Sequence, residues 1–297
     1  MRRTVRVPFR IDLGRSLRPL RVGRNDPTIL LGPRAVVRAS RTPLGPATLR
    51  AEHHGDRFEL EAWGPGAEWS LDQAPGLLGC LDDRDGFDPP DGPVRRLHHD
   101  LDGLRLTRTG RVMEALVPAV LGQRVTGFEA RRSYHQLVER WGEPAPGPGG
   151  LFLHPLPEQI AMIPYYELHL IGMERRRADA LKRVAAHGSR LEDAGNGSSA
   201  ALRERLETVP GIGVWTSAEV ARIALGDPDA VSVGDYHLKH LVSWALAGEP
   251  RGTDARMLEL LEPYAGHRGR VCVLLEASGA RAPRRGPRRR IEPLAAR

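Results

Sequence analysis

The first third of the chain alternates apolar and polar residues. Over residues 5–13, from Val5 to Leu13, every second position is apolar, which is the period of a strand with one buried face. Shorter apolar runs bounded by Gly, Pro or His-Gly-Asp predict an antiparallel meander. These runs cover residues 28–31, 34–39, 47–52 and 57–63, and residues 73–80 suit a short closing helix. Residues 1 to about 80 are therefore expected to be mainly β.

From about residue 107 the apolar spacing becomes helical. A stripe from Met113 to Leu121 is the first example, and Gly122-Gln123-Arg124 interrupts it. Similar patterns predict further helices over residues 128–141, 157–163, 174–187, 254–261 and 268–277. The second part is therefore expected to be mostly α-helical, and the fold class is α+β.

Residues 81–103 separate these two parts. They are crowded with Asp, Pro and Gly, a composition typical of a domain boundary. We expect an N-terminal α+β domain with its linker at residues 1–93, a helical domain at residues 94–280, and a basic tail at residues 281–297.

The net charge of +7 is concentrated in the tail. Seven arginines and one glutamate there account for six of the seven net positive charges, so the rest of the chain is nearly neutral. A basic, proline-rich segment is expected to be disordered and solvated, and it can also add salt-sensitive attraction to phosphate. Both interpretations stay open, because one does not exclude the other.

Cysteine content and hydropathy disfavour several classes of protein. The two cysteines, Cys80 and Cys272, are too few for a disulfide framework or a four-cysteine iron–sulfur cluster. No run approaches the roughly 18 apolar residues of a membrane helix, and the N-terminus lacks the apolar core of a signal peptide. We therefore expect a soluble, cytoplasmic protein that does not associate with membranes.

The most informative stretch, residues 203–239, predicts two helices joined by a tight turn. The first helix should end at Pro210, and the turn is the Pro-Gly-Ile-Gly of residues 210–213. Its glycines allow positive φ and leave room for another backbone. The N–H groups that open the second helix, expected over residues 216–225, lack partners and carry the positive end of its dipole. A phosphate is the natural ligand of such a turn.

Two acidic residues of this stretch have purely structural explanations. Asp235 precedes a third predicted helix, and an aspartate at that position most often caps the helix. Thr216 and Glu219 have the spacing of a capping box at the start of the second helix.

The turn and the aspartate together resemble a known signature. VPGIGVWTSAEVA at residues 209–221, followed by VSVGDYHLKH at residues 231–240, resembles the helix-hairpin-helix of the HhH-GPD superfamily of DNA glycosylases. The match looks most like the bacterial 3-methyladenine DNA glycosylase II type. LGQRVTGFEA at residues 121–130 and GMERRRADAL at residues 172–181 are similar to other segments of that family. The resemblance implies a small N-terminal antiparallel sheet with helices ahead of a helical glycosylase core.

The resemblance also assigns roles to residues. It implies a catalytic carboxylate at Asp235, a base pocket formed by Trp215, Tyr236, His267 and Gln123, and DNA contacts from Gly211, Gly213, Val214, Thr216 and Arg124. It further implies that the backbone carbonyls of Glu207, Val209 and Ile212 hold a structural monovalent cation. No other cofactor is expected.

Three positions depart from the family pattern. Arg124 stands where close relatives have an apolar wedge; an arginine there can stack or bind phosphate, and a solvated loop arginine is an equal alternative. His267 stands near an aromatic pocket wall of relatives, and Glu219 stands where some have a tyrosine. Both departures put the details of the base pocket in question.

The expected function is that of a monofunctional DNA glycosylase in base excision repair. It would flip alkylated purines such as 3-methyladenine out of double-stranded DNA and excise them by hydrolysis, leaving an abasic site. Strand cleavage is not expected, because Trp215 stands where the glycosylase/lyases have a nucleophilic lysine. The alternatives are a glycosylase for deaminated or oxidised bases and a noncatalytic DNA-binding protein. The family also implies a monomer.

Overall fold

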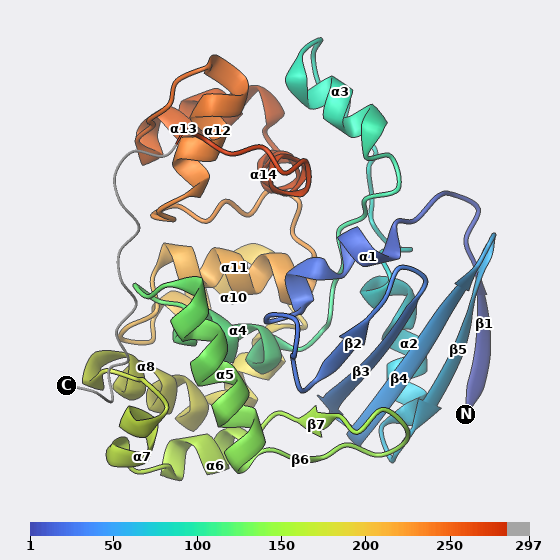
Figure 1. Ribbon diagram of the computed structural model, residues 1–297, viewed down its shortest axis with the longest axis vertical. Helices are drawn as coiled ribbons and strands as arrows, with labels where there is room; N and C mark the ends of the chain where they lie inside the picture. The colour runs from blue at the N-terminus through green and yellow to red at the C-terminus, as the bar shows by residue number, and fades with distance from the viewer. Residues whose placement is uncertain (284–297) are drawn as a thin grey trace.

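The chain folds into an antiparallel sheet that lies beside a larger helical part (Figure 1). The computed structural model describes residues 1–283. Most of the basic tail predicted at residues 281–297 falls outside the described residues. The predicted α+β fold, with the sheet first and the helical core after it, is confirmed. No helix within residues 1–283 is long and apolar enough to cross a membrane.

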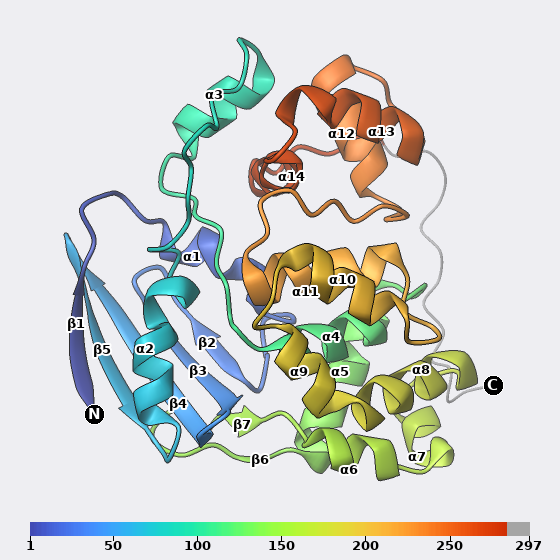
Figure 2. The same cartoon turned by 180° about the vertical axis from the view of Figure 1, so that it is seen from behind.

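The sheet has five strands in the order β1-β5-β4-β3-β2, and every neighbouring pair is antiparallel. The strands are β1 (Arg2–Arg6), β2 (Ile29–Leu31), β3 (Ala35–Thr42), β4 (Gly45–His54) and β5 (Arg57–Trp63). The predicted meander is therefore confirmed. Helix α2 (Ala67–Leu77) lies across one face of the sheet and begins earlier than the predicted residue 73 (Figure 2). Its apolar side chains share a core with Phe58 and Leu60.

The first strand is shorter than the alternation predicts. β1 ends at Arg6, so the prediction of a strand through Leu13 is wrong. Pro8 has no N–H to donate to a neighbouring strand. Helix α1 (Leu13–Ser16) then begins, because the Oδ1 of Asp12 accepts the N–H of Arg15 at 3.0 Å and caps it. A short 3-10 helix, η1 (Arg18–Leu20), follows.

The middle of the chain forms one helical lobe around a single core. Its helices are α4 (Val112–Leu121), α5 (Gly127–Trp141), α6 (Pro157–Met162), α7 (Tyr165–Leu170), α8 (Arg175–Ala186), α9 (Gly188–Ala194), α10 (Ser199–Glu207) and α11 (Val214–Leu225). Two-residue strands, β6 (Glu143–Pro144) and β7 (Phe152–Leu153), pair after α5. The predicted helices agree with α4, α5, α6 and α8, whereas the short α7 and α9 have no counterpart in the prediction.

The last helices form a second lobe together with the segment that follows the sheet and α2. They are α12 (Leu238–Ala247), α13 (Asp254–Leu261), the 3-10 helix η2 (Glu262–Tyr264) and α14 (Arg268–Ala277). The segment contributes α3 (Pro93–Asp100), and Phe87, Val94 and Leu104 share the core of this lobe. The division between domains at residues 93 and 94 remains a prediction, and α3 begins beside it.

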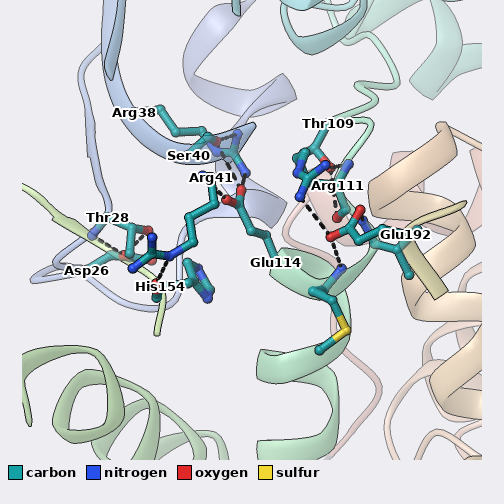
Figure 3. Close-up of polar contacts among 12 residues, drawn as sticks. Asp26, Thr28, Arg38, Ser40, Arg41, Thr109, Arg111, Glu114, His154 and Glu192 are labelled. Carbon is teal, nitrogen blue, oxygen red and sulfur yellow. Dashed lines mark hydrogen bonds and ion pairs between the residues drawn. The ribbon is translucent and has the colours of Figure 1, made fainter. Parts of the chain in front are cut away.

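A buried ionic network joins the sheet to the middle lobe (Figure 3). Glu114 of α4 accepts hydrogen bonds from the Arg38 guanidinium at 2.6 Å, the Ser40 hydroxyl at 3.0 Å and the Arg41 N–H at 2.8 Å. Burial opposes ionisation of Glu114, but the positive charge of Arg38 and its neighbours offsets this and holds the pKa below its ordinary value. The network fixes α4, and so the loop that follows α4, against the sheet.

Candidate active site

The two glycines of the turn between α10 and α11 differ in conformation and surroundings. Gly211 has a φ of +99°, and a Cβ there would lie 2.9 Å from the Cβ of Ala180. Gly213 has an ordinary extended φ of −119°, and a Cβ there would have no atom of the chain within 4 Å. The fold therefore requires glycine at residue 211, whereas at residue 213 the missing side chain only leaves open space.

That open space lies at the N-terminus of α11. Gly213 is the N-cap of this helix and provides no side-chain cap, and Val214 in the first turn is 47% exposed. The first N–H groups of a helix have no intrahelical partner and carry the positive end of its dipole. The arrangement suits an anion such as a backbone phosphate. Thr216, the third residue of α11, differs from Val214 because its side chain is buried. Only its backbone N–H belongs to the first helical turn that could contact an anion.

Gln123 ties the α4–α5 loop to the same turn. Its Nε2 donates to the carbonyl of Gly211 and to the hydroxyl of Thr216, each at 3.0 Å. The next residue, Arg124, is exposed and has a φ of +56°, the one positive φ outside glycine among residues 1–283. Such a conformation costs a non-glycine residue about 1 kcal/mol or more. Gln123 thus serves as a bridge between loop and turn, and Arg124 projects from the loop.

Asp235 uses its two carboxylate oxygens for different partners. Oδ1 accepts the N–H groups of His237 and Leu238 at 2.7 and 2.8 Å, and so caps the start of α12. Oδ2 accepts the indole N–H of Trp215 at 3.1 Å. Asp235 is only partly buried. The N-cap residue of α12 is His237, so Asp235 is not the N-cap itself, although its Oδ1 accepts the first N–H of the helix. The other oxygen is held by a side chain of α11.

Trp215 connects three parts of the site. It lies in the first turn of α11, it bonds Asp235, and its ring edge would be 3.7 Å from a Cβ placed on Gly122. The α4–α5 loop, the turn and the aspartate are therefore gathered around one indole ring.

Two predicted pocket residues have their main contacts elsewhere. Tyr236 is 67% exposed, and its ring packs edge-on against His237 and His240. The His267 ring lies 5.0 Å from that of Phe87, and its Nδ1 accepts a hydrogen bond from Arg270. Arg270 in turn is paired with the buried Asp82. The contacts that orient His267 therefore come from the segment after the sheet and from α14.

The predicted capping box at Thr216 and Glu219 is wrong. Helix α11 begins at Val214, so Thr216 is already its third residue and Gly213 is the N-cap. Glu219 instead forms an ion pair with Arg222 at 2.7 Å and accepts a short hydrogen bond from Ser232.

Sequence reasoning missed three residues near Glu219. Arg222 and Ser232 contact Glu219, and the charges of Asp235 and Glu219 both act on the carboxyl of Glu276 in α14. Arg222 lies seven residues after Trp215 on the same helix, so helical periodicity contained a signal for it. Ser232 and Glu276 carry no local signal, because only the tertiary fold brings them to α11.

Two carbonyl groups of the turn already accept hydrogen bonds within the protein. The Val209 carbonyl accepts the N–H of Ile212 at 3.0 Å, and the adjacent Pro210 carbonyl accepts from Arg183 at 3.3 Å. A carbonyl has a second lone pair, so a monovalent cation remains compatible with the predicted set of Glu207, Val209 and Ile212. Among residues 1–283, no group of three or more His, Cys, Asp or Glu side chains is arranged to hold a metal ion.

The family comparison covers the residues that build this site. Residues 117–265, half of the chain, match the model of the HhH-GPD superfamily base excision DNA repair protein. The match includes the end of α4, the turn, Trp215 and Asp235.

Two curated proteins are similar over about half of the chain. The "Probable bifunctional transcriptional activator/DNA repair enzyme AlkA" of Mycobacterium tuberculosis is 34% identical over 156 residues, which are 52% of this chain and 31% of that protein. The "DNA-3-methyladenine glycosylase 2" of Escherichia coli is 29% identical over 150 residues, which are 50% of this chain and 53% of that protein. The match thus spans about a third and about half of the length of these relatives.

One solved structure is similar over nearly the whole fold. It is described as "3-methyladenine dna-glycosylase from Archaeoglobus fulgidus", and it aligns with a TM-score of 0.77 over 93% of this chain and 98% of that chain. The sequence identity is 18%, so this likeness establishes the shared fold, sheet included.

Proposed function

The chain belongs to the HhH-GPD superfamily of base excision DNA repair proteins, and from this premise we propose that it is a monofunctional DNA glycosylase for alkylated purines. Its substrate would be double-stranded DNA containing a base such as 3-methyladenine. The contact that carries the proposal is the hydrogen bond from Trp215 to Asp235, which joins a carboxylate to the helix that opens at the glycine turn.

The proposed roles follow the geometry. A glycosidic bond within stacked duplex DNA is inaccessible, so the nucleotide must be rotated out at a cost of a few kcal/mol. The uncapped N–H groups after Gly213 would bind a backbone phosphate, and Val214 and Thr216 would contribute backbone N–H groups. Arg124 would brace or fill the gap in the stack, supported by the bonds of Gln123 to the turn.

Asp235 would act in the bond-breaking step. The bond between C1′ and the base nitrogen breaks, its electron pair leaves with the base, and positive charge builds on the sugar. The Asp235 carboxylate would stabilise that charge, and water then forms the new bond to C1′ while transferring its proton to Asp235, which passes it to solvent. An N-alkylated purine already carries positive charge and leaves as a neutral molecule, so one carboxylate is sufficient. The products are a free base and an abasic site.

The remaining pocket assignments are also proposals. The face of Trp215 would pack against the flipped base, and Tyr236 and His267 would approach it at the rim. The carbonyls of Glu207, Val209 and Ile212 would hold a structural monovalent cation that keeps the turn rigid. The enzyme would act as a monomer on DNA in the cytoplasm and would need no cofactor for the chemical step.

Release of free bases from methylated duplex DNA tests the activity. The proposal predicts release of 3-methyladenine and 7-methylguanine, identified by chromatography, without cleavage of the strand. Borohydride reduction during the reaction tests the monofunctional mode, because a lyase would be trapped on DNA through a Schiff base. Capture of the protein on DNA would overturn that part, and release of no base from any substrate would overturn the glycosylase proposal.

A further inference from the structure

Helix α11 contacts the loop that carries Asp235 at two successive positions on one face. Trp215, Glu219 and Arg222 are spaced four and three residues apart, so they line that face together. Trp215 donates to Asp235, and Glu219 accepts from Ser232, three residues before Asp235. Glu219 therefore lies one helical turn from the indole that holds the proposed catalytic carboxylate.

Negative charge exceeds positive charge at this place. The one guanidinium of the cluster, Arg222, is paired with Glu219 at 2.7 Å. Burial raises the pKa of Glu276; Arg222 opposes the shift, and the charges of Glu219 and Asp235 add to it. Burial also raises the pKa of the Cys272 thiol to about 12, with the charge of Glu276 adding to the effect. Glu276 thus lies within the influence of two other carboxyl groups and of the Arg222 guanidinium, which is itself paired with Glu219.

These charged groups reach solvent and are not sealed in the core. The side chains of Glu219 and Arg222 are 25% and 15% exposed, and Glu276 has exposed surface although its carboxyl group is desolvated by its neighbours. The buried side of α11 is formed instead by small apolar residues such as Ala218 and Ala221, which pack against Ala230. Glu219 therefore keeps part of its carboxylate at the surface, one helical turn along α11 from Trp215.

We propose that Glu219, assisted by Glu276, is a specificity-determining residue that makes the site electronegative and so selects cationic, N-alkylated purines over neutral damaged bases. This inference rests on the proposed glycosylase function. A cationic base gains Coulombic attraction from a nearby carboxylate in partly desolvated surroundings, whereas a neutral base does not. The positive charge moves from the base to the sugar during cleavage. The attraction between Glu219 and the base therefore stabilises the complex with the flipped base more than it stabilises the transition state. Glu219 should therefore lower KM more than it raises kcat.

The test compares Glu219→Gln with the wild type on two matched duplexes, one with 7-methylguanine and one with hypoxanthine. Glutamine keeps an acceptor for Ser232 and removes the charge. We expect the preference for 7-methylguanine to fall about tenfold or more, through a higher KM for the cationic base and unchanged constants for the neutral one. Glu276→Gln should shift the preference in the same direction by less. Glu204→Gln on α10 is the matched control for loss of one carboxylate and should leave both substrates unchanged.

Several results would overturn the inference. An unchanged preference, or a shift toward 7-methylguanine, would exclude selection by charge. An equal loss of kcat on both duplexes would make Glu219 a positioning residue that acts on Asp235 through Ser232. If Glu219→Gln does not fold, Glu276→Gln decides by the same criterion. Wild-type protein that releases both bases without the expected change in Glu219→Gln would overturn this inference alone. Release of hypoxanthine but no 7-methylguanine would also overturn the assignment of alkylated purines as substrates, and release of neither base from any duplex would overturn the glycosylase function as a whole.

Discussion

The indole N–H of Trp215 and the Oδ2 of Asp235 are 3.1 Å apart, while the Oδ1 of the same carboxylate accepts two backbone N–H groups at the start of α12. Both oxygens of Asp235 are therefore fixed, one by α11 and one by the helix that follows it. A carboxylate held in this way needs little reorganisation when charge develops beside it, which is how fixed groups contribute most to catalysis.

Replacing Trp215 by phenylalanine removes the donor but keeps an aromatic face. A hydrogen bond to a charged group contributes about 1.5–3 kcal/mol, so kcat for base release should fall about tenfold or more with little change in KM. Single-turnover kinetics on methylated duplex DNA measure this. Trp244→Phe on α12, where the indole is 38% exposed, is the matched control. An unchanged kcat in Trp215→Phe would mean that the hydrogen bond plays no part in the reaction.

The two glycines of the turn should respond differently to alanine. Gly211→Ala should lower the free energy of unfolding by about 1–3 kcal/mol, because the position has positive φ and the new Cβ meets Ala180. Gly213→Ala should leave stability unchanged, because its φ is ordinary and the space is open. It should nevertheless weaken DNA binding severalfold, since the Cβ enters the proposed phosphate site.

Chemical denaturation and DNA-binding titrations separate these two effects. Full DNA affinity in Gly213→Ala would argue against a phosphate at the start of α11. Full stability in Gly211→Ala would mean that the chain tolerates the positive φ and the close approach.

The buried pair of Glu114 and Arg38 should be important for stability. Glu114→Gln leaves the Arg38 guanidinium with a neutral partner in an almost buried position, so unfolding should require about 3 kcal/mol less. Because the folded-state pKa of Glu114 lies below the ordinary 4.5, this contribution is complete above pH 4.5 and is lost as the pH falls through the lower value. The difference between wild type and variant should therefore be constant from pH 5 to 8 and narrow in acid.

Urea denaturation at several pH values checks this prediction. Glu59→Gln, which removes the partner of Arg57 from an exposed pair on β5, is the control and should change stability little. A difference between wild type and Glu114→Gln that grows in acid would contradict the assigned direction of the pKa shift.

Local patterns in the sequence predicted most elements of the fold. The strands from β2 to β5 and the helices α4, α5, α13 and α14 all follow from periodicity, because their buried faces repeat every two or every 3.6 residues. The end of β1 at Arg6 did not follow, since the apolar alternation continues past Pro8 into residues that pack in the core without pairing in the sheet. Helices α3, α7 and α9 are six to eight residues long and leave too little periodic signal.

The candidate site likewise contains residues that a local sequence pattern identifies and residues that it does not. Asp235, Trp215 and the turn stand in one contiguous stretch, so a resemblance of that stretch identifies them together. Ser232 and Glu276 become partners of α11 only through tertiary packing, which no local pattern encodes. The spacing of Thr216 and Glu219 predicts a capping box only if the helix starts at residue 216. Spacing alone cannot tell where α11 begins, and the helix begins two residues earlier, at Val214.

The most direct test of the central claim is base release from methylated duplex DNA by the wild type and by Asp235→Asn, with DNA affinity measured in parallel. Asparagine keeps the capping acceptor for α12 and removes the negative charge. The account predicts that the wild type releases 3-methyladenine, and that Asp235→Asn binds the same DNA equally well but releases bases at least about a hundredfold more slowly. Equal rates of release from the two proteins would contradict the assignment of Asp235 as the catalytic carboxylate.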